Sequence, residues 1–178
     1  MSSFWIAARS TILKSFVFDV EVRTVQSAHE SFTREIVTHP GAVAVVAVNK
    51  NIEVAVLKQY RATLDLDNLE IPAGTCDRQD EDTLATAKRE LLEEIGGTSQ
   101  HWSLLAKFYN SPGWTDQVTT VYLAEEVIVG PAAPEGPEEL AISVQWMPLE
   151  EVKGLLSSTS VVDGTAAIGL YAWLNHQT

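Results

Sequence analysis

The sequence has little of three features that would each assign it to a large class of proteins. It contains a single cysteine, Cys76, so an internal disulfide is excluded and a reducing compartment is expected. Only 12 Lys and Arg stand against 24 Asp and Glu, which argues against a nucleic-acid surface because phosphate backbones select clustered cations. No apolar run approaches the length of a membrane span, and the N-terminal stretch lacks a signal peptide's apolar core. We therefore expect a cytoplasmic protein that binds neither nucleic acid nor membrane.

The pattern of apolar residues predicts an α+β fold. With 178 residues and a hydrophobic share of 46%, the chain is long enough for one domain with a proper core. Alternating or β-branched runs predict strands at 16–25, 31–39, 42–49, 51–61, 69–71, 102–109, 117–127 and 140–148. Helical spacing predicts helices at 82–95, 149–156 and 164–175. Residues 1–39 are expected to form a small antiparallel sheet, and residues 40–178 the main domain.

The predicted helix at 82–95 carries an unusual group of acids in the stretch KRELLEEIGG. Glu90, Glu93 and Glu94 are spaced so that all three lie on one side of the helix, beside its apolar stripe. Carboxylates gathered at the edge of a core are unfavourable unless a cation neutralises them, and their oxygens suit Mg²⁺ or Mn²⁺. The alternative is a solvated acidic helix face with Lys88 and Arg89 as neighbours.

A longer pattern around this helix resembles the Nudix box, the loop–helix–loop signature of the Nudix hydrolases. It reads Gly74, six residues, Glu81, seven residues, then Arg89-Glu90-Leu91-x-Glu93-Glu94-x-Gly96. Two positions depart from the signature, because the first spacing is usually five residues and Gly97 stands where an aliphatic residue is usual. The resemblance implies a three-layer α/β/α sandwich around a mixed sheet.

The same resemblance implies a role for each residue of the box. Arg89 would hold the acids in place by charge pairing. Glu93 would be a further ligand or the residue that handles water, and Glu81 would also support the loop electrostatically. The ligand candidates for Mg²⁺, with Mn²⁺ as the alternative, are Glu90, Glu94, Glu93, Glu81 and the backbone carbonyl of Ala73.

Other stretches look like the ADP-ribose pyrophosphatase branch of that family. They are REIVTHPGAVAVVAV, LKQYR, LEIPAG and SPGWTDQ, and the resemblance covers about residues 14–150. Pro112 falls fifteen residues after Gly97, where a proline is the marker of this branch, whereas Gln117 replaces the usual acid. The branch implies hydrolysis of the nucleoside diphosphate compound ADP-ribose to AMP and ribose 5-phosphate.

The branch also implies a homodimer in which the N-terminal sheets are swapped and help to hold the adenine. Phe16 and Phe18 would then stack on the base, or pack in the core. Arg34 and Arg61 would contact phosphate or ribose, or form salt bridges with residues such as Glu35 or Glu70. The substrate-binding candidates are Arg61, Arg34, Glu70, Trp114, Phe18, Phe16 and Gly113.

The general base is expected in the late acidic stretch EGPEEL. Glu138 is the first candidate and Glu139 the second, and an exposed acidic loop is the alternative. Three other functions stay open. They are hydrolysis of another nucleoside diphosphate sugar or a dinucleotide, a catalytically silent nucleotide sensor, and an interaction domain with an incidental acidic helix.

Overall fold

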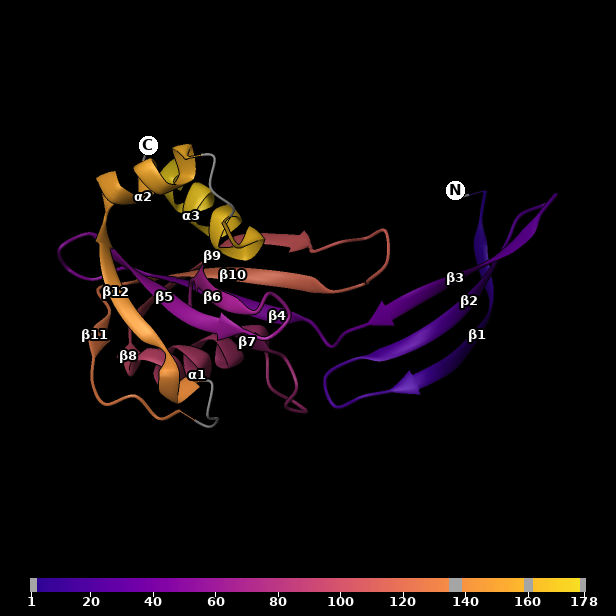
Figure 1. Ribbon diagram of the computed structural model, residues 1–178, viewed down its shortest axis with the longest axis horizontal. Helices are drawn as coiled ribbons and strands as arrows, with labels where there is room; N and C mark the ends of the chain where they lie inside the picture. The colour runs from indigo at the N-terminus through magenta and orange to yellow at the C-terminus, as the bar shows by residue number, and fades with distance from the viewer. Residues whose placement is uncertain (1–2, 135–138, 159–161, 177–178) are drawn as a thin grey trace.

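The computed structural model describes residues 3–134, 139–158 and 162–176, and these form a layered domain with a separate N-terminal sheet (Figure 1). The elements in chain order are β1 (Trp5–Lys14), β2 (Asp19–Gln26), β3 (Ser31–Thr38), β4 (Ala42–Ala47), β5 (Glu53–Arg61), β6 (Leu66–Glu70), β7 (Ala73–Thr75), α1 (Thr83–Ile95), β8 (Gly97–Thr98), β9 (His101–Tyr109), β10 (Val118–Glu125), β11 (Ile128–Val129), the 3₁₀ turn η1 (Glu139–Ala141), β12 (Ser143–Pro148), α2 (Leu149–Ser157) and α3 (Gly164–His176). No helix in these described ranges is long and apolar enough to cross a membrane.

Two sheets form the middle layer of the domain. One has the order β7-β4-β10-β9 and contains a parallel pair, β4 with β10, and the other has the order β12-β5-β6 and is antiparallel. Successive residues of β4 face opposite sides. Val43 and Val45 pack with α1, whereas Ala44 and Val46 pack in a second core that includes residues of α2 and α3. The predicted α/β/α sandwich around a mixed sheet is therefore confirmed.

The boundaries of α1 follow from its terminal residues. Asp82 caps the start, since its carboxylate accepts a hydrogen bond of 2.8 Å from the backbone N–H of Ala85. Gly96 ends the helix in the left-handed conformation, with φ of 65°. Gly97 is buried, and an added Cβ would lie 2.9 Å from Cγ of Leu91. The unusual glycine at this position is thus explained by the lack of space for a side chain.

The N-terminal sheet has the order β1-β2-β3 and stands beside the domain in Figure 1. The strand expected at 16–25 begins only at Asp19, because the three residues before it belong to the connection from β1. The whole of β1 is absent from the strands that the sequence predicts. All ten of its residues are exposed in the single chain, so no inward-facing stripe marks it.

This sheet is attached to the domain through the loop 111–116. Arg23 on β2 forms an ion pair of 2.9 Å with Asp116, whose other oxygen accepts a hydrogen bond of 3.0 Å from the backbone N–H of His39. The backbone N–H of Val37 donates to the carbonyl of Trp114 at 2.9 Å. Burial of the His39 ring lowers its pKa although Asp116 opposes this, and Nδ1 of the ring accepts a hydrogen bond of 3.0 Å from the backbone N–H of Gly41.

Candidate active site

Two of the predicted ligands lie against the short strand β7. The carboxylate of Glu94 accepts a hydrogen bond of 3.0 Å from the backbone N–H of Ala73. The carboxyl group of Glu90 packs directly on Gly74, where an added Cβ would overlap it. The small residues of the Ala-Gly pair therefore let the carboxylates of α1 approach the backbone closely. Glu90 is 9% exposed, which means that α1 holds an ionisable group at the margin of the core.

Arg89 holds three acids of the box together, Glu81, Glu90 and Glu93. Its Nη1 contacts Glu90 at 2.7 Å and Glu93 at 2.8 Å, and its Nη2 contacts Glu81 at 3.3 Å. Burial alone would lower the pKa of Arg89, but the hydrogen bonds and charges of these three acids raise it. Burial would likewise raise the pKa of Glu81, but its hydrogen bonds with Arg89 and Thr86 lower it. The guanidinium therefore favours the charged form of Glu81 and fixes the orientation of all three acids.

The donor set of the box fits a hard divalent cation. Carboxylates from one face of α1 and the backbone of β7 supply oxygen only, the ligand type that Mg²⁺ and Mn²⁺ prefer. Within the described part of the chain, no three His, Cys, Asp or Glu side chains already converge at the spacing of a metal site. Instead, Arg89 lies among Glu81, Glu90 and Glu93 as their common ion-pair partner.

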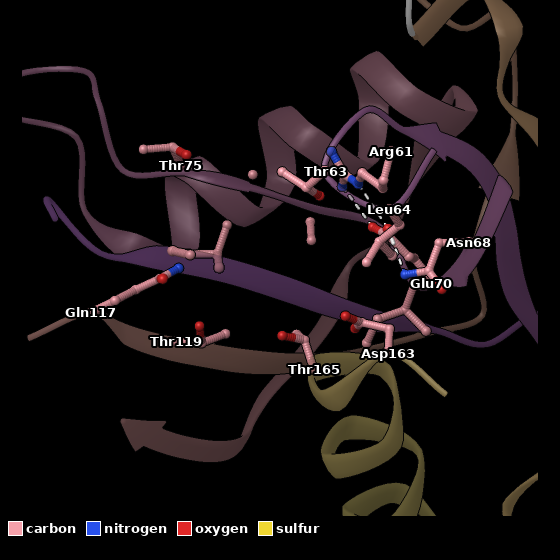
Figure 2. A pocket seen from close by; sticks show the side chains of 15 residues that line it. Arg61, Thr63, Leu64, Asn68, Glu70, Thr75, Gln117, Thr119, Asp163 and Thr165 are labelled. Atoms are coloured by element: carbon pink, nitrogen blue, oxygen red, sulfur yellow. Dashed lines mark hydrogen bonds and ion pairs between the residues drawn. The ribbon is translucent and has the colours of Figure 1, made fainter. Parts of the chain in front are cut away.

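A pocket of about 380 Å³ opens beside β7, between the two sheets and the start of α3 (Figure 2). Ala73, Gly74 and Thr75 form the wall that it shares with the box carboxylates. Its polar lining comes from β7 and from the ends of β5, β6, β10 and α3, and consists of Arg61, Thr63, Asn68, Glu70, Thr75, Gln117, Thr119, Asp163 and Thr165. The pocket therefore joins the acidic helix α1 to a wall rich in hydroxyl and amide groups.

Arg61 and Glu70 meet in this pocket as a two-pronged ion pair. Nε and Nη2 of Arg61 lie 2.7 and 2.6 Å from the two oxygens of Glu70, and Asn68 donates a further hydrogen bond of 3.1 Å. The hydrogen bond with Glu70 raises the pKa of Arg61. Burial would raise the pKa of Glu70, but Arg61 and Asn68 lower it. Of the two partners that the sequence suggested for Arg61, the structure selects Glu70 rather than Glu35.

The other predicted binding residues do not line this pocket within one chain. Gly113 and Trp114 lie in the loop 111–116, and the Trp114 side chain is exposed. Arg34 lies over the ring of Phe32 at 4.5 Å from its centre. Phe16 and Phe18 border a second hollow of about 360 Å³ between the N-terminal sheet and the residues that lead into β4. These residues form a separate group around the N-terminal sheet.

Of the two candidates for the general base, the structure describes the position of Glu139 in the chain. Glu138 lies outside the described residues. Glu139 begins η1, just before β12. Both stay predictions.

Several pocket residues were not predicted from the sequence. Thr63, Thr119 and Thr165 carry no pattern that distinguishes them from other threonines. Asp163 does have a signal, because an aspartate directly before the helix at 164 is a typical N-cap. Its place in the pocket depends on the packing of α3 beside β6 and β10, which no local pattern predicts.

Comparison with known proteins assigns the class of the chain. Residues 38–163 match the model of the NUDIX domain, which is more than half of the sequence. The chain therefore belongs to the NUDIX domain family, and the resemblance based on the box is confirmed.

Two relatives and one solved structure are similar to most of the chain. The ADP-ribose pyrophosphatase of Bacillus subtilis is 37% identical over 164 residues, 92% of this chain and 88% of the relative. The ADP-ribose pyrophosphatase of Mycobacterium tuberculosis is 34% identical over 140 residues, 79% of this chain and 68% of the relative. A solved structure described as an ADP compounds hydrolase has a TM-score of 0.84 at 20% identity, over 99% of this chain and 97% of the other, which shows the shared fold.

Proposed function

We propose that this protein hydrolyses the pyrophosphate bond of ADP-ribose to AMP and ribose 5-phosphate. The observation that carries the proposal is the position of the box carboxylates, Glu90 and Glu94, on the far side of the wall of a pocket with hydroxyl and amide groups. A pyrophosphate needs a charged site, and the sugar attached to it needs hydrogen-bonding groups. The box carboxylates therefore suit the pyrophosphate of the substrate, and the pocket suits its sugar. The names of the two curated relatives support the same substrate.

A divalent cation, Mg²⁺ or Mn²⁺, is part of the proposal. Glu90 and Glu94 would hold it, with Glu93, Glu81 and the Ala73 carbonyl as further ligand candidates. When bound, such a cation neutralises phosphate charge and lowers the pKa of water. Catalysis at a pyrophosphate is mostly positioning and electrostatics, because little covalent chemistry falls to the protein.

The protein's own residues have separate tasks in this reaction. Arg89 would keep the acids oriented through its ion pairs. Arg61, which is fixed by Glu70 and lines the pocket, is proposed to contact ribose rather than phosphate oxygens of the substrate. A carboxylate near the attacking water would take its proton, and Glu138 or Glu139 is proposed for that role.

We also propose a cytoplasmic homodimer, formed through the N-terminal sheet of residues 1–39. Contiguous exposed apolar side chains mark interaction surfaces, because they lose contact with water on association. Exposed side chains of this kind gather on β1 and its connection to β2: Phe4, Trp5, Ile6, Ile12, Leu13, Phe16, Val17 and Phe18. In a swapped dimer, Phe16, Phe18 and Arg34 of one chain would reach the substrate bound to the other, together with Gly113 and Trp114.

The reaction is tested by phosphatase-coupled turnover of ADP-ribose with Mg²⁺. AMP and ribose 5-phosphate are phosphatase substrates, whereas the uncleaved compound is not. The panel includes GDP-mannose, NADH and diadenosine polyphosphates, and the variants are Glu94→Gln and, as a matched control, Glu150→Gln on the exposed surface of α2. We expect a preference for ADP-ribose that is lost with EDTA and in Glu94→Gln but kept in Glu150→Gln.

Two results would contradict the proposal in different ways. Preference for another compound would retain the reaction type and reject the substrate. Binding of nucleotides without turnover of any compound would favour a silent sensor.

A further inference from the structure

The charges that line the pocket beside β7 do not suit a free phosphate group. Among the described lining residues, Arg61 is the one cation, and it stands against two carboxylates, Glu70 and Asp163. Both prongs of Arg61 are already directed to Glu70, at 2.7 and 2.6 Å. The lining therefore has a net negative charge, which favours a neutral group over an anion.

Asp163 is held in a fixed position at the start of α3. One oxygen of its carboxylate accepts a hydrogen bond of 2.8 Å from the backbone N–H of Ala166, and its own carbonyl accepts one of 2.8 Å from Ala167. Figure 2 shows Asp163 and Thr165 at the start of the helix, on the opposite side of the pocket from Arg61 and Thr63. Asp163 is close enough to Arg61 that its charge contributes to the raised pKa of that guanidinium.

A carboxylate fixed in this way has the chemistry to recognise a hydroxylated group. An ionised carboxylate only accepts hydrogen bonds and has about four acceptor sites, of which the N-cap bond uses one. Thr165 adds a hydroxyl group that can donate or accept. The Thr119 hydroxyl already donates to Oδ1 of Asn110 at 2.7 Å, and the Asn68 amide donates to Glu70 at 3.1 Å. A sugar supplies neighbouring hydroxyl donors, whereas a phosphate in the same place would be repelled by the negative charge.

We propose that Asp163 is a specificity-determining residue, which accepts hydrogen bonds from hydroxyl groups of the distal sugar and disfavours substrates with an additional phosphate on that sugar. The inference rests on the proposed function, since it assigns the pocket to the sugar half of a nucleoside diphosphate sugar. It adds a residue from the start of α3, outside the Nudix box and the N-terminal sheet.

The test uses two variants that preserve the helix cap. Asn and Ser are both good N-cap residues, so Asp163→Asn and Asp163→Ser are expected to keep α3 capped and to leave the melting temperature of the protein unchanged. Asp67→Asn is the matched control, because it removes the same charge from an exposed ion pair with Lys58 that does not line the pocket. Each protein is assayed on ADP-ribose, on the methyl ester of ADP, and on ADP-ribose with a phosphate on its distal ribose.

We expect kcat/KM for ADP-ribose to fall by about 10- to 100-fold in both Asp163 variants, mainly through KM, as for a lost hydrogen bond to a charged group. Turnover of the methyl ester should change by less than about twofold, because this compound has no distal sugar with which Asp163 could form hydrogen bonds. The wild type's preference for ADP-ribose over the phosphorylated compound should shrink by about tenfold in Asp163→Asn. Asp67→Asn should match the wild type on all three.

Two results would overturn the inference. One is an equal loss on ADP-ribose and the methyl ester, which would place the effect outside the sugar. The other is unchanged kcat/KM for ADP-ribose in both variants. If the wild type fails to hydrolyse ADP-ribose at all, the proposed reaction is wrong, and calorimetric binding of ADP-ribose decides the inference separately. Weaker binding in Asp163→Asn would support it, and equal binding would refute it.

Discussion

Replacing Gly74 by alanine is expected to displace the Glu90 carboxyl group while the protein stays folded. The new Cβ would overlap Cδ and both carboxylate oxygens of Glu90. Carbon atoms in ordinary contact lie about 3.5–4.0 Å apart, so the carboxyl group must move by roughly 1 Å or more. Glu90 is buried and tied to Arg89 at 2.7 Å, so this movement also disturbs the ion pair that orients the box.

The expected loss of activity follows from that displacement. A misplacement of about 1 Å in a catalytic arrangement can reduce the rate by about 100-fold. Overpacking of this kind lowers the free energy of unfolding by about 1–3 kcal/mol, which leaves a domain of ordinary stability folded. The assay measures kcat on ADP-ribose beside a urea titration of Gly74→Ala, so that rate and stability are separated.

The same substitution at Gly154 in α2 is the control. An added Cβ there meets no atom within 4 Å, and alanine is the better helix former, so activity should be unchanged and stability slightly higher. Activity of Gly74→Ala within about threefold of the wild type would refute the close packing of Glu90 on β7 as a requirement for catalysis.

Two further predictions concern ion pairs. Glu70→Gln should lower the free energy of unfolding at pH 7 by about 1–2 kcal/mol, a value reduced from that of a fully buried pair because Arg61 is partly exposed. Although burial opposes the shift, Arg61 lowers the pKa of Glu70 below its ordinary 4.5, so the contribution is present above about pH 4.5 and lost as the pH falls through the lowered pKa. Urea titrations of the two proteins should therefore converge in acid, and a constant difference would contradict the assignment. Asp116→Asn should weaken the attachment of the N-terminal sheet to the domain, because it removes the charge that pairs with Arg23. Amide exchange at His39 should become about tenfold faster, and an unchanged rate would show that backbone contacts suffice.

Local patterns predicted the parts of the fold that depend on neighbours in sequence. The helix expected at 82–95 is present as Thr83–Ile95, since its apolar stripe, its Asp82 cap and Gly96 are all encoded within one segment. The meeting of Arg89 with Glu81 and Glu93 was predictable for the same reason, because all three belong to one loop and helix.

Features that depend on packing between distant segments were not predictable. The strand β1 shows no buried face in the single chain, so its sequence gives no alternation to detect. The partner of Arg61 was open between two acids, and only the pairing of β5 with β6 places Glu70 within reach. Asp163 and Thr63 line one pocket because α3 packs near β6, although the two residues are far apart in the sequence.

The parallel pair of β4 and β10 determines how much of the chain must be synthesised before the protein can become active. Ala42 pairs with Thr119, and both β7 and α1 are made between them. Parallel pairs with such a long crossover form slowly, because the chain entropy of closing the loop is lost before the contacts are gained. A nascent chain released before β10 has emerged would contain the complete Nudix box but not the central sheet that supports it. Ribosome-bound chains should therefore acquire the proposed activity only after Glu125 has left the exit tunnel.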